Sequence, residues 1–367
     1  MPTVFFAFRD APERRAALHA EEALDRYRLF GLDEIRARGA QVRHNLEPEG
    51  PPPLWARAAA KAVNRLLRLT GGYGGDFASA LASLRTANEA DDVFTTTDTV
   101  GVPLILLKWV GLLRPPLVYV AIGLPERLMQ LRRRPARRLY AGALRRADTI
   151  VAYSQSEAEW LRTWLAPGAP AVLFLPFGVD VEAFSPDPGR SEDVDVVSVG
   201  ADPRRDFDLL KAVAAQHPEL RFRIVATKDH ARSLGTLPAN VSLETDLSLE
   251  QVRDRLAAAR VVALPVRRNS YSGATTVLLQ AMALAKPVVV SRTDAISEGY
   301  ALQDGVNCRL VEPGDATAFE RVLLETLADS RSLGSRARET VEREFSWKSY
   351  TDTLWEILSA ACKRDPS

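Results

Sequence analysis

The chain has 367 residues, 48 of them Lys or Arg and 47 Asp or Glu, a length that suits two α/β domains with separate cores. Because the charges nearly cancel, no global electrostatic field favours nucleic acid as a partner. The two cysteines, Cys308 and Cys362, form no spaced metal-ligand set and no disulfide framework, which fits a reducing compartment. The first residues do not follow the order of a signal peptide, so a cytoplasmic protein is expected.

Carboxylates follow two expected strands in the first hundred residues. Residues 4–8 read as a buried strand, and Asp10 lies just beyond its carboxyl end. A second strand ends at Asp98. A carboxylate at such an edge could accept a proton from a substrate hydroxyl. For Asp98 the favoured alternative is that it caps the following helix.

Between these strands lie a basic amphipathic helix, expected over residues 55–69, and a glycine-rich loop over residues 70–76. Two glycine pairs could cradle a phosphate, but no strand precedes them. A flexible loop is therefore the favoured interpretation.

The longest apolar stretch, residues 100–124, is interrupted by Lys108, Arg114 and two adjacent prolines, so it reads as buried strands and a helix. Glu126 follows it and offers a further carboxylate, although an acidic residue in a helix first turn is its ordinary explanation. The next segment carries eight arginines: Arg127, Arg132, Arg133, Arg134, Arg137, Arg138, Arg145 and Arg146. Interleaved apolar residues would let residues 127–146 contact anionic lipid or a polyanionic acceptor. A solvated helix face is the favoured alternative.

Pro and Gly density places a domain boundary at residues 176–192. Beyond it, a strand and a glycine turn lead to Arg204 and Arg205, whose guanidinium groups would suit a diphosphate at the carboxyl edge of a sheet. The alternative is surface ion pairing with a neighbouring aspartate. Lys228 follows the next strand and is a second, weaker candidate for the same role.

Residues 265–291 read as one strand, loop, helix and strand unit, which puts the loop at a carboxyl edge where ligands bind. The loop enters the helix through four small residues, Gly273, Ala274, Thr275 and Thr276. Backbone amides at the positive end of a helix bind phosphate. Ordinary helix capping explains these residue types equally well.

This unit resembles the donor-site motif of retaining glycosyltransferases with the GT-B fold, and in particular of family 4. The family motif is a Glu, seven residues and a second Glu, followed by Ala-Met-Ala and Pro-Val-Val. Here Ser272 and Gln280 stand at the two Glu positions, and residues 281–283 and 287–289 supply the tripeptides. In the family these positions contact the transferred sugar and the ribose. The resemblance therefore assigns sugar and ribose binding to Gln280, Ser272 and the adjacent Tyr271.

The resemblance extends over roughly residues 115–360, with a Pro-x-Gly-Val-Asp turn at residues 176–180. The chain departs from the family at two further positions. Ile122 stands where a His contacts the donor sugar, and Ala201 stands where an Arg binds the diphosphate, with Arg205 near the family's Lys.

The resemblance implies an α/β protein with two Rossmann-like domains, the GT-B fold, facing across a cleft. Residues 1–180 would bind the acceptor and residues 181–345 the nucleotide sugar, while the C-terminal helix, residues 346–367, would cross back to the first domain. Such enzymes generally need no metal, and no metal motif is present. No cofactor is therefore expected beyond the nucleotide sugar as co-substrate.

The expected activity is transfer of a hexose-like sugar to an acceptor hydroxyl with retention of anomeric configuration. The acceptor proton would pass to a phosphate oxygen of the donor. If a protein carboxylate acts instead, the candidates are Asp98, Glu126 and Asp10, in that order. Two alternatives stay open. One is a catalytically silent GT-B subunit, suggested by Ser272 and Ile122. The other is a GT-B epimerase, which the scarcity of carboxylates near the donor site disfavours.

Overall fold

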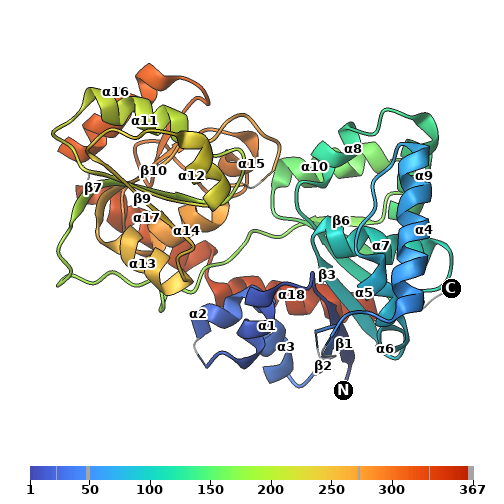
Figure 1. The fold of residues 1–367 in the computed structure, drawn as a ribbon. Helices are drawn as coiled ribbons and strands as arrows, with labels where there is room; N and C mark the ends of the chain where they lie inside the picture. The colour runs from blue at the N-terminus through green and yellow to red at the C-terminus, as the bar shows by residue number, and fades with distance from the viewer. Residues whose placement is uncertain (22, 47–49, 272, 330, 363–367) are drawn as a thin grey trace. The chain divides into compact units, whose positions relative to one another are not determined.

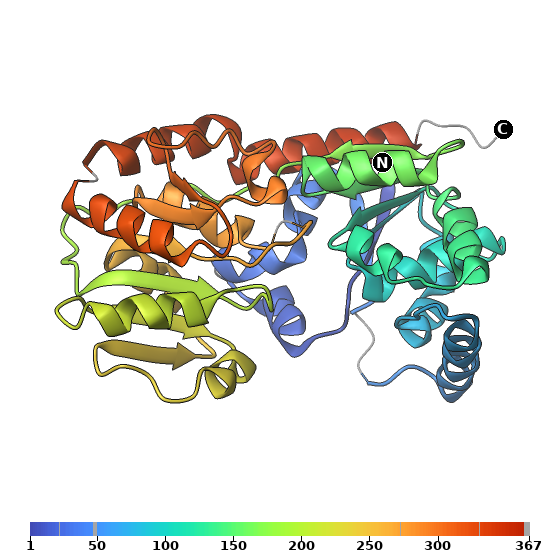
Figure 2. The same cartoon turned by 90° about the horizontal axis from the view of Figure 1, so that it is seen from above.

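The computed structural model describes residues 1–21, 23–46, 50–271, 273–329 and 331–362. The chain divides into two compact units, Met1–Leu175 together with Thr351–Ser367, and Pro176–Tyr350. Each unit contains one six-stranded parallel sheet with helices on both faces (Figures 1 and 2). The predicted α/β architecture with two Rossmann-like sheets is confirmed.

The N-terminal sheet has the order β2-β1-β3-β4-β5-β6. Its strands are β1 (Thr3–Ala7), β2 (Gln41–His44), β3 (Asp92–Thr96), β4 (Leu117–Ala121), β5 (Thr149–Ala152) and β6 (Ala171–Phe174). The helical elements of this unit are α1 (Pro12–His19), α2 (Ala23–Arg26), η1 (Tyr27–Leu29), α3 (Leu32–Ala37), α4 (Leu54–Thr70), α5 (Phe77–Ala82), α6 (Leu84–Asn88), α7 (Asp98–Trp109), α8 (Leu124–Met129), α9 (Arg134–Leu144) and α10 (Gln155–Leu165). From Thr351 onward, α18 (Trp347–Cys362) also belongs to this unit.

The C-terminal sheet has the order β12-β11-β10-β7-β8-β9. Its strands are β7 (Val194–Gly200), β8 (Phe222–Ala226), β9 (Val241–Thr245), β10 (Ala259–Leu264), β11 (Val288–Ser291) and β12 (Arg309–Val311). The helices are α11 (Phe207–Gln216), α12 (Lys228–Leu234), α13 (Leu249–Ala257), α14 (Thr275–Ala283), α15 (Asp294–Ser297), α16 (Ala316–Ala328) and α17 (Arg331–Glu344). In Figure 1, α11 and α16 lie on one face of the sheet and α13, α14 and α17 on the other.

The central strands are buried on both faces, as expected of parallel sheets covered by helices. Every residue of β3 and β4 is buried, and β1 pairs in parallel with β3, with Phe6 opposite Phe94. Parallel strands place all their carboxyl ends at one edge, so residues that follow different strands gather there.

The glycine-rich loop after α4 is anchored, contrary to the flexible loop favoured from sequence. A Cβ on Gly74 would lie 1.6 Å from Asn64 Oδ1, and one on Gly75 would lie 2.4 Å from the Thr99 carbonyl oxygen. The amide of Tyr73 donates to the Tyr140 hydroxyl at 2.9 Å. The glycines therefore permit close backbone packing. The phosphate-cradle alternative gains no support, because these amide groups bond within the unit.

Candidate functional site

The N-terminus of α14 lies at the carboxyl edge of the second sheet. Its N-cap residue is Ala274, and among the described residues no side chain caps it. Side chains cap four neighbouring helices, α11, α12, α13 and α16, through Asp206, Thr227, Ser248 and Asp315. The first amide groups of α14 therefore remain available to an anion, which the positive helix end would favour.

Arg205 is buried at the same edge. Its side chain is 3% exposed, and Nη2 donates to the Val199 carbonyl, whereas Nε and Nη1 have no partner among the described residues. Burial lowers the pKa of Arg205 to about 10. For Arg205 the surface-pairing alternative is wrong, because its side chain is buried and Arg267 pairs with Asp206 and Asp208, at 3.3 Å and 2.9 Å.

Contacts between two loops bring most of the expected diphosphate residues together. The Tyr271 hydroxyl donates to Asp202 at 2.8 Å, and the Arg267 amide donates to the Arg204 carbonyl at 2.8 Å. A Cβ on Gly273 would lie 3.0 Å from the Asp202 carboxylate, so this position suits glycine. The structure thus places the loop at residues 201–205 against the loop that enters α14.

Further buried polar atoms lie on the same segment. Both side-chain polar atoms of Asn269 and Oγ1 of Thr275 are buried and lack a partner within the described part of the chain. Buried polar atoms are usually hydrogen-bonded, since desolvation otherwise costs about 1–3 kcal/mol each. Together with Arg205, these atoms form a set of donors and acceptors suited to a polar ligand. Sequence analysis singled out Thr275 but not Asn269.

The remaining donor-side residues differ in exposure. Gln280 lies on α14 and is 2% exposed, whereas Thr276 is exposed. Lys228 begins α12, and its ion pair with Asp246, at 2.5 Å, raises the pKa of the lysine. Ser272 lies outside the described residues.

On the first sheet, Asp98 is the first residue of α7 and is 4% exposed. Tyr119 donates a hydrogen bond to one carboxylate oxygen, and the Arg127 guanidinium lies 3.3 Å from the other. Burial raises the pKa of Asp98, although both neighbours oppose that rise. The favoured capping role is wrong, because Thr97 is the N-cap of α7 and no described side chain makes a cap bond there.

Glu157 is a buried carboxylate that sequence analysis missed. It lies in the first turn of α10, is 1% exposed, and accepts a hydrogen bond of 2.9 Å from the Gly123 amide. Burial raises its pKa to about 8, and the charges of Asp98 and Glu126 add to the rise. A Glu in a helix first turn reads as an ordinary dipole partner, so local sequence does not reveal that this one is buried. Glu126 itself is half-buried on α8.

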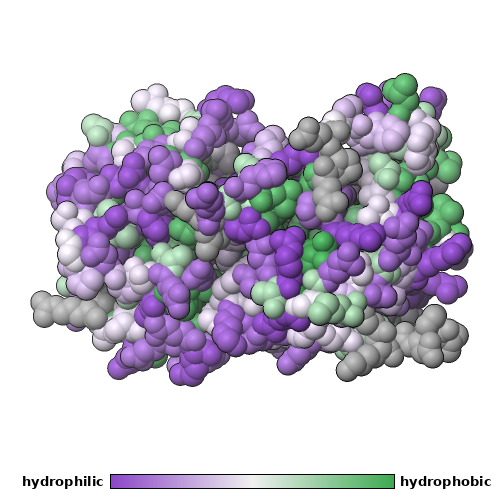
Figure 3. Space-filling model, turned by 90° about the horizontal axis from the view of Figure 1, so that it is seen from below, coloured by the Kyte–Doolittle hydropathy of each residue, from purple (hydrophilic) through white to green (hydrophobic). Residues whose placement is uncertain are grey.

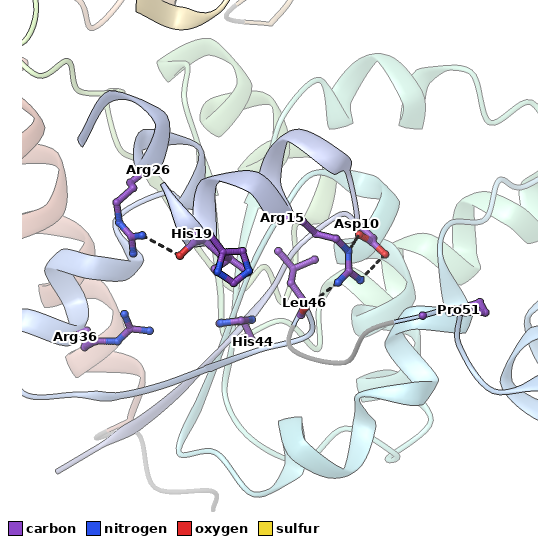
Figure 4. A pocket seen from close by; sticks show the side chains of 10 residues that line it. Asp10, Arg15, His19, Arg26, Arg36, His44, Leu46 and Pro51 are labelled. Atoms are coloured by element: carbon purple, nitrogen blue, oxygen red, sulfur yellow. Dashed lines mark hydrogen bonds and ion pairs between the residues drawn. The ribbon is translucent and has the colours of Figure 1, made fainter. Parts of the chain in front are cut away.

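Asp10 lies beside a large cavity of the N-terminal unit. Arg15 binds both of its carboxylate oxygens, at 2.7 Å and 2.9 Å, and this hydrogen bonding lowers the pKa of Asp10. The cavity measures about 800 Å³ (Figure 4). Its ionisable lining residues are Asp10, Arg15, His19, Arg26, Arg36 and His44. Arg15 bonds to Asp10, and Arg26 and Arg36 both pair with Asp33, so the three arginines present fixed guanidinium groups to the cavity beside two histidines. Such a lining suits a polar acceptor that carries negative charge. Sequence analysis did not single out either histidine.

The segment that carries the expected donor site matches a known family. Residues 195–329 match the family model described as glycosyl transferases group 1. This segment is a group 1 glycosyltransferase domain. It contains β7 from Asp195 onward, β8 to β12, both loops described above, and α14.

Curated relatives match the chain over a longer stretch than the family model does. The chain is 28% identical over 233 residues to the MMP alpha-(1->4)-mannosyltransferase of Mycolicibacterium hassiacum, covering 60% of this chain and 56% of that protein. It is 27% identical over 254 residues to the D-inositol 3-phosphate glycosyltransferase of Kineococcus radiotolerans, covering 59% and 58%. The matches thus span just over half the length of these relatives.

Solved structures show the fold of the whole chain to be GT-B. The sucrose-phosphate synthase of Thermosynechococcus elongatus aligns with a TM-score of 0.73 at 19% identity, covering 98% of this chain and all of that one. Anabaena Alr3699/HepE in complex with UDP-glucose aligns with a TM-score of 0.69 at 17% identity and the same coverage. The predicted GT-B fold around the group 1 domain is confirmed.

The described residues contain neither a metal-binding cluster nor a membrane-spanning helix. No three His, Cys, Asp or Glu side chains within them are grouped to hold a metal ion. No helix among them combines the length and apolar character needed to cross a membrane.

Proposed function

We propose that the protein transfers a sugar from a nucleoside diphosphate sugar to an acceptor hydroxyl, with retention of anomeric configuration. One observation carries the proposal. The buried guanidinium of Arg205 makes no ion pair among the described residues and lies at the same sheet edge as the uncapped N-terminus of α14. Both features favour a doubly charged anion such as a diphosphate.

In the proposed reaction, the bond between the anomeric carbon and the diphosphate oxygen breaks while the acceptor oxygen bonds to the anomeric carbon. The amides of residues 273–276, with Arg205, Arg204 and Lys228, stabilise the negative charge of the departing diphosphate. No metal ion is needed for that role. Gln280 holds the ribose through its amide, and Tyr271 and Ser272 line the sugar.

The acceptor proton passes to a phosphate oxygen of the donor. If a protein carboxylate takes it instead, Asp98 is the first candidate, then Glu126 and Asp10. The raised pKa of Asp98 suits a base, whereas the lowered pKa of Asp10 does not. Asp98→Asn distinguishes proton transfer to Asp98 from proton transfer to the donor phosphate. If Asp98 is the base, the substitution lowers kcat by about a hundredfold or more; if the phosphate is the base, it does not.

The N-terminal unit is proposed to bind the acceptor through the cavity beside Asp10. The relatives include an enzyme named for inositol 3-phosphate, and the basic lining of this cavity is consistent with an anionic acceptor of that kind. We also propose a cytoplasmic location, with the arginines of residues 127–146 adding positive charge for contact with anionic lipid or a polyanionic acceptor.

The test measures release of nucleoside diphosphate from a panel of nucleotide sugars. The panel begins with GDP-mannose, which appears in the name of one relative, and UDP-glucose, which is bound in one similar structure. A transferase releases nucleoside diphosphate and forms a glycoside whose anomeric configuration NMR determines. A silent subunit, the alternative that Ser272 and Ile122 suggest, binds the nucleotide sugar without turnover. An epimerase changes the sugar and releases nothing.

A further inference from the structure

Helix α4 has an outward face that the core does not use. Only Ala56, Ala60 and Leu67 of its 17 residues are buried, and Val63 packs against the core beside them. These positions recur at a spacing of three to four and so form one narrow inner stripe. The rest of the helix surface lies outside the core of the N-terminal unit, where Figure 1 shows α4 as a long blue helix.

The outward side carries an apolar ridge. Trp55, Leu66 and Leu69 are 60%, 62% and 66% exposed, and the exposed Ala58 and Ala62 lie between them at the same helical spacing. Leu54 at the start of the helix is 79% exposed. Four large apolar side chains exposed on one helix are more than the scattered single exposures that soluble surfaces tolerate. Figure 3 shows hydrophobic patches, in green, within a largely hydrophilic surface.

A basic row runs beside this ridge. Arg57, Lys61, Arg65 and Arg68 recur at spacings of four, four and three, and all four are exposed. On a helical projection the basic row and the apolar ridge are roughly 115° apart. The arc between them faces away from the buried stripe. The sequence contains no Asp or Glu from residue 50 to residue 75. The exposed face therefore combines apolar side chains with positive charge only.

The arginine-rich segment extends the positive charge at the end of α4. The Arg133 guanidinium donates to the Leu69 carbonyl at 2.7 Å, and Arg134, Arg137 and Arg138 are exposed on α9. The apolar residues of that segment are core residues instead. Leu128, Leu131, Tyr140 and Leu144 are all buried, and Met129 is the exposed exception. Residues 127–146 alone can thus supply charge but few side chains for insertion.

We propose that α4 docks the protein on an anionic phospholipid bilayer. Its axis would lie in the membrane plane, with Trp55, Leu66 and Leu69 in the interface and the lysine and arginines against lipid phosphates. Charge complementarity selects this occupant, because a face with exposed Leu and Trp, four cations and no carboxylate matches an anionic interface with an apolar interior. The inference does not depend on transferase activity, and the vesicle experiment below needs no sugar substrate.

The experiment measures binding of the full chain to vesicles of phosphatidylcholine with and without about 30% phosphatidylglycerol. We expect about tenfold or greater preference for the anionic vesicles, weakened as salt rises from about 0.1 M to about 0.5 M. Brominated acyl chains should quench part of the tryptophan fluorescence, and Trp55→Phe should remove that part. No preference for anionic vesicles, or quenching that persists in Trp55→Phe, overturns the proposal.

Paired variants separate the two components of the surface. Leu66→Ser with Leu69→Ser should weaken anionic vesicle binding about tenfold, whereas Leu66→Met with Leu69→Met should preserve it. Replacing Arg57, Lys61 and Arg65 by Gln should weaken binding and reduce its salt dependence. The matched control replaces Arg221, Arg232 and Arg321, which are exposed arginines of the other unit, by Gln.

Circular dichroism verifies that each variant keeps its helical content. Equal losses in the α4 and control triple variants, unchanged binding of the Ser variant, or retention on duplex nucleic acid with no binding to vesicles would each refute membrane docking by α4.

Discussion

The phenolic hydroxyl of Tyr119 donates a hydrogen bond to the buried carboxylate of Asp98. Tyr119 lies on β4 and Asp98 begins α7, so the bond joins two elements at the carboxyl edge of the N-terminal sheet. Burial raises the pKa of both groups. The Tyr119 hydroxyl and the Asp98 carboxylate therefore form with each other the hydrogen bond that water would provide at an exposed site.

A double-mutant cycle should detect this bond. Tyr119→Phe removes the donor, while Asp98→Ala removes the carboxylate that accepts the bond. We expect a coupling free energy of about 1.5–3 kcal/mol in urea unfolding at neutral pH, typical of hydrogen bonds to charged groups. Additive effects of the two substitutions would contradict the pairing.

Glu157 should make stability depend on pH. Its folded pKa is raised from 4.5 to about 8, so its favourable contribution to the free energy of unfolding is complete below the unfolded pKa and is lost as pH rises through about 8. Glu157→Gln keeps an acceptor for the Gly123 amide but cannot ionise. Relative to wild type, this variant should gain stability between about pH 5 and about pH 8, by roughly 5 kcal/mol at most.

Urea unfolding of both proteins at about pH 5 and about pH 8 measures this gain in stability. The exposed Glu159, on the same helix, provides the control through Glu159→Gln, which should show no comparable pH dependence. A parallel pH profile for wild type and Glu157→Gln would show that burial does not shift this carboxyl group.

Arg205→Met tests the diphosphate site. Affinity for a nucleoside diphosphate, measured by calorimetry, should fall by about tenfold or more, which corresponds to about 1.4 kcal/mol or more. The unliganded variant should keep its stability, because the substitution removes a buried charge that makes no ion pair among the described residues. Arg221→Met, at an exposed arginine of the same unit outside the proposed site, serves as control. Unchanged affinity in a folded Arg205→Met protein removes this residue from the site.

Arg36→Gln tests the acceptor cavity. Arg36 is about half exposed at the cavity and contacts Asp33 at 3.3 Å, so its loss should spare the fold. With an anionic acceptor, we expect KM for the acceptor to rise about tenfold while affinity for the nucleoside diphosphate stays within about twofold. Arg85→Gln, at an exposed site outside the cavity, should change neither value. An equal rise in KM for both variants would show that Arg36 does not bind the acceptor in this cavity.

Gly75→Ala tests the anchored loop. The added methyl group would lie 2.4 Å from the Thr99 carbonyl oxygen and 2.9 Å from Pro103, so the backbone must move. We expect a loss of about 2 kcal/mol or more in the free energy of unfolding. Gly142→Ala in α9 is the control, because its methyl group would have a single neighbour at 3.6 Å and a helix prefers Ala by roughly 1 kcal/mol. Equal effects of the two substitutions would show that close packing does not select glycine at residue 75.

The local sequence pattern was sufficient to predict the strands, loop and helix that form the proposed donor site. The apolar run before Pro265, the small residues at 273–276 and the apolar spacing after Thr275 predict a strand, a loop and a helix, and β10, α14 and β11 follow that order. Helix and strand periodicities involve residues a few positions apart, so a single segment contains the whole signal. The glycosyltransferase resemblance rests on the same short stretches.

Tertiary structure alone decided how side chains are used. The sequence suggested the same role for Arg204 and Arg205, yet Arg205 is buried whereas Arg204 is exposed. Arg267 pairs with the neighbouring aspartates. Glu157 bonds to the amide of Gly123, 34 residues away, and Tyr119 bonds to Asp98, 21 residues away. Burial and hydrogen bonding of this kind depend on which strands become neighbours in the sheet. No local period encodes that choice. For this reason the sequence predicts the helix proposed to bind the diphosphate, but it does not predict which charged side chains around that helix are buried or paired.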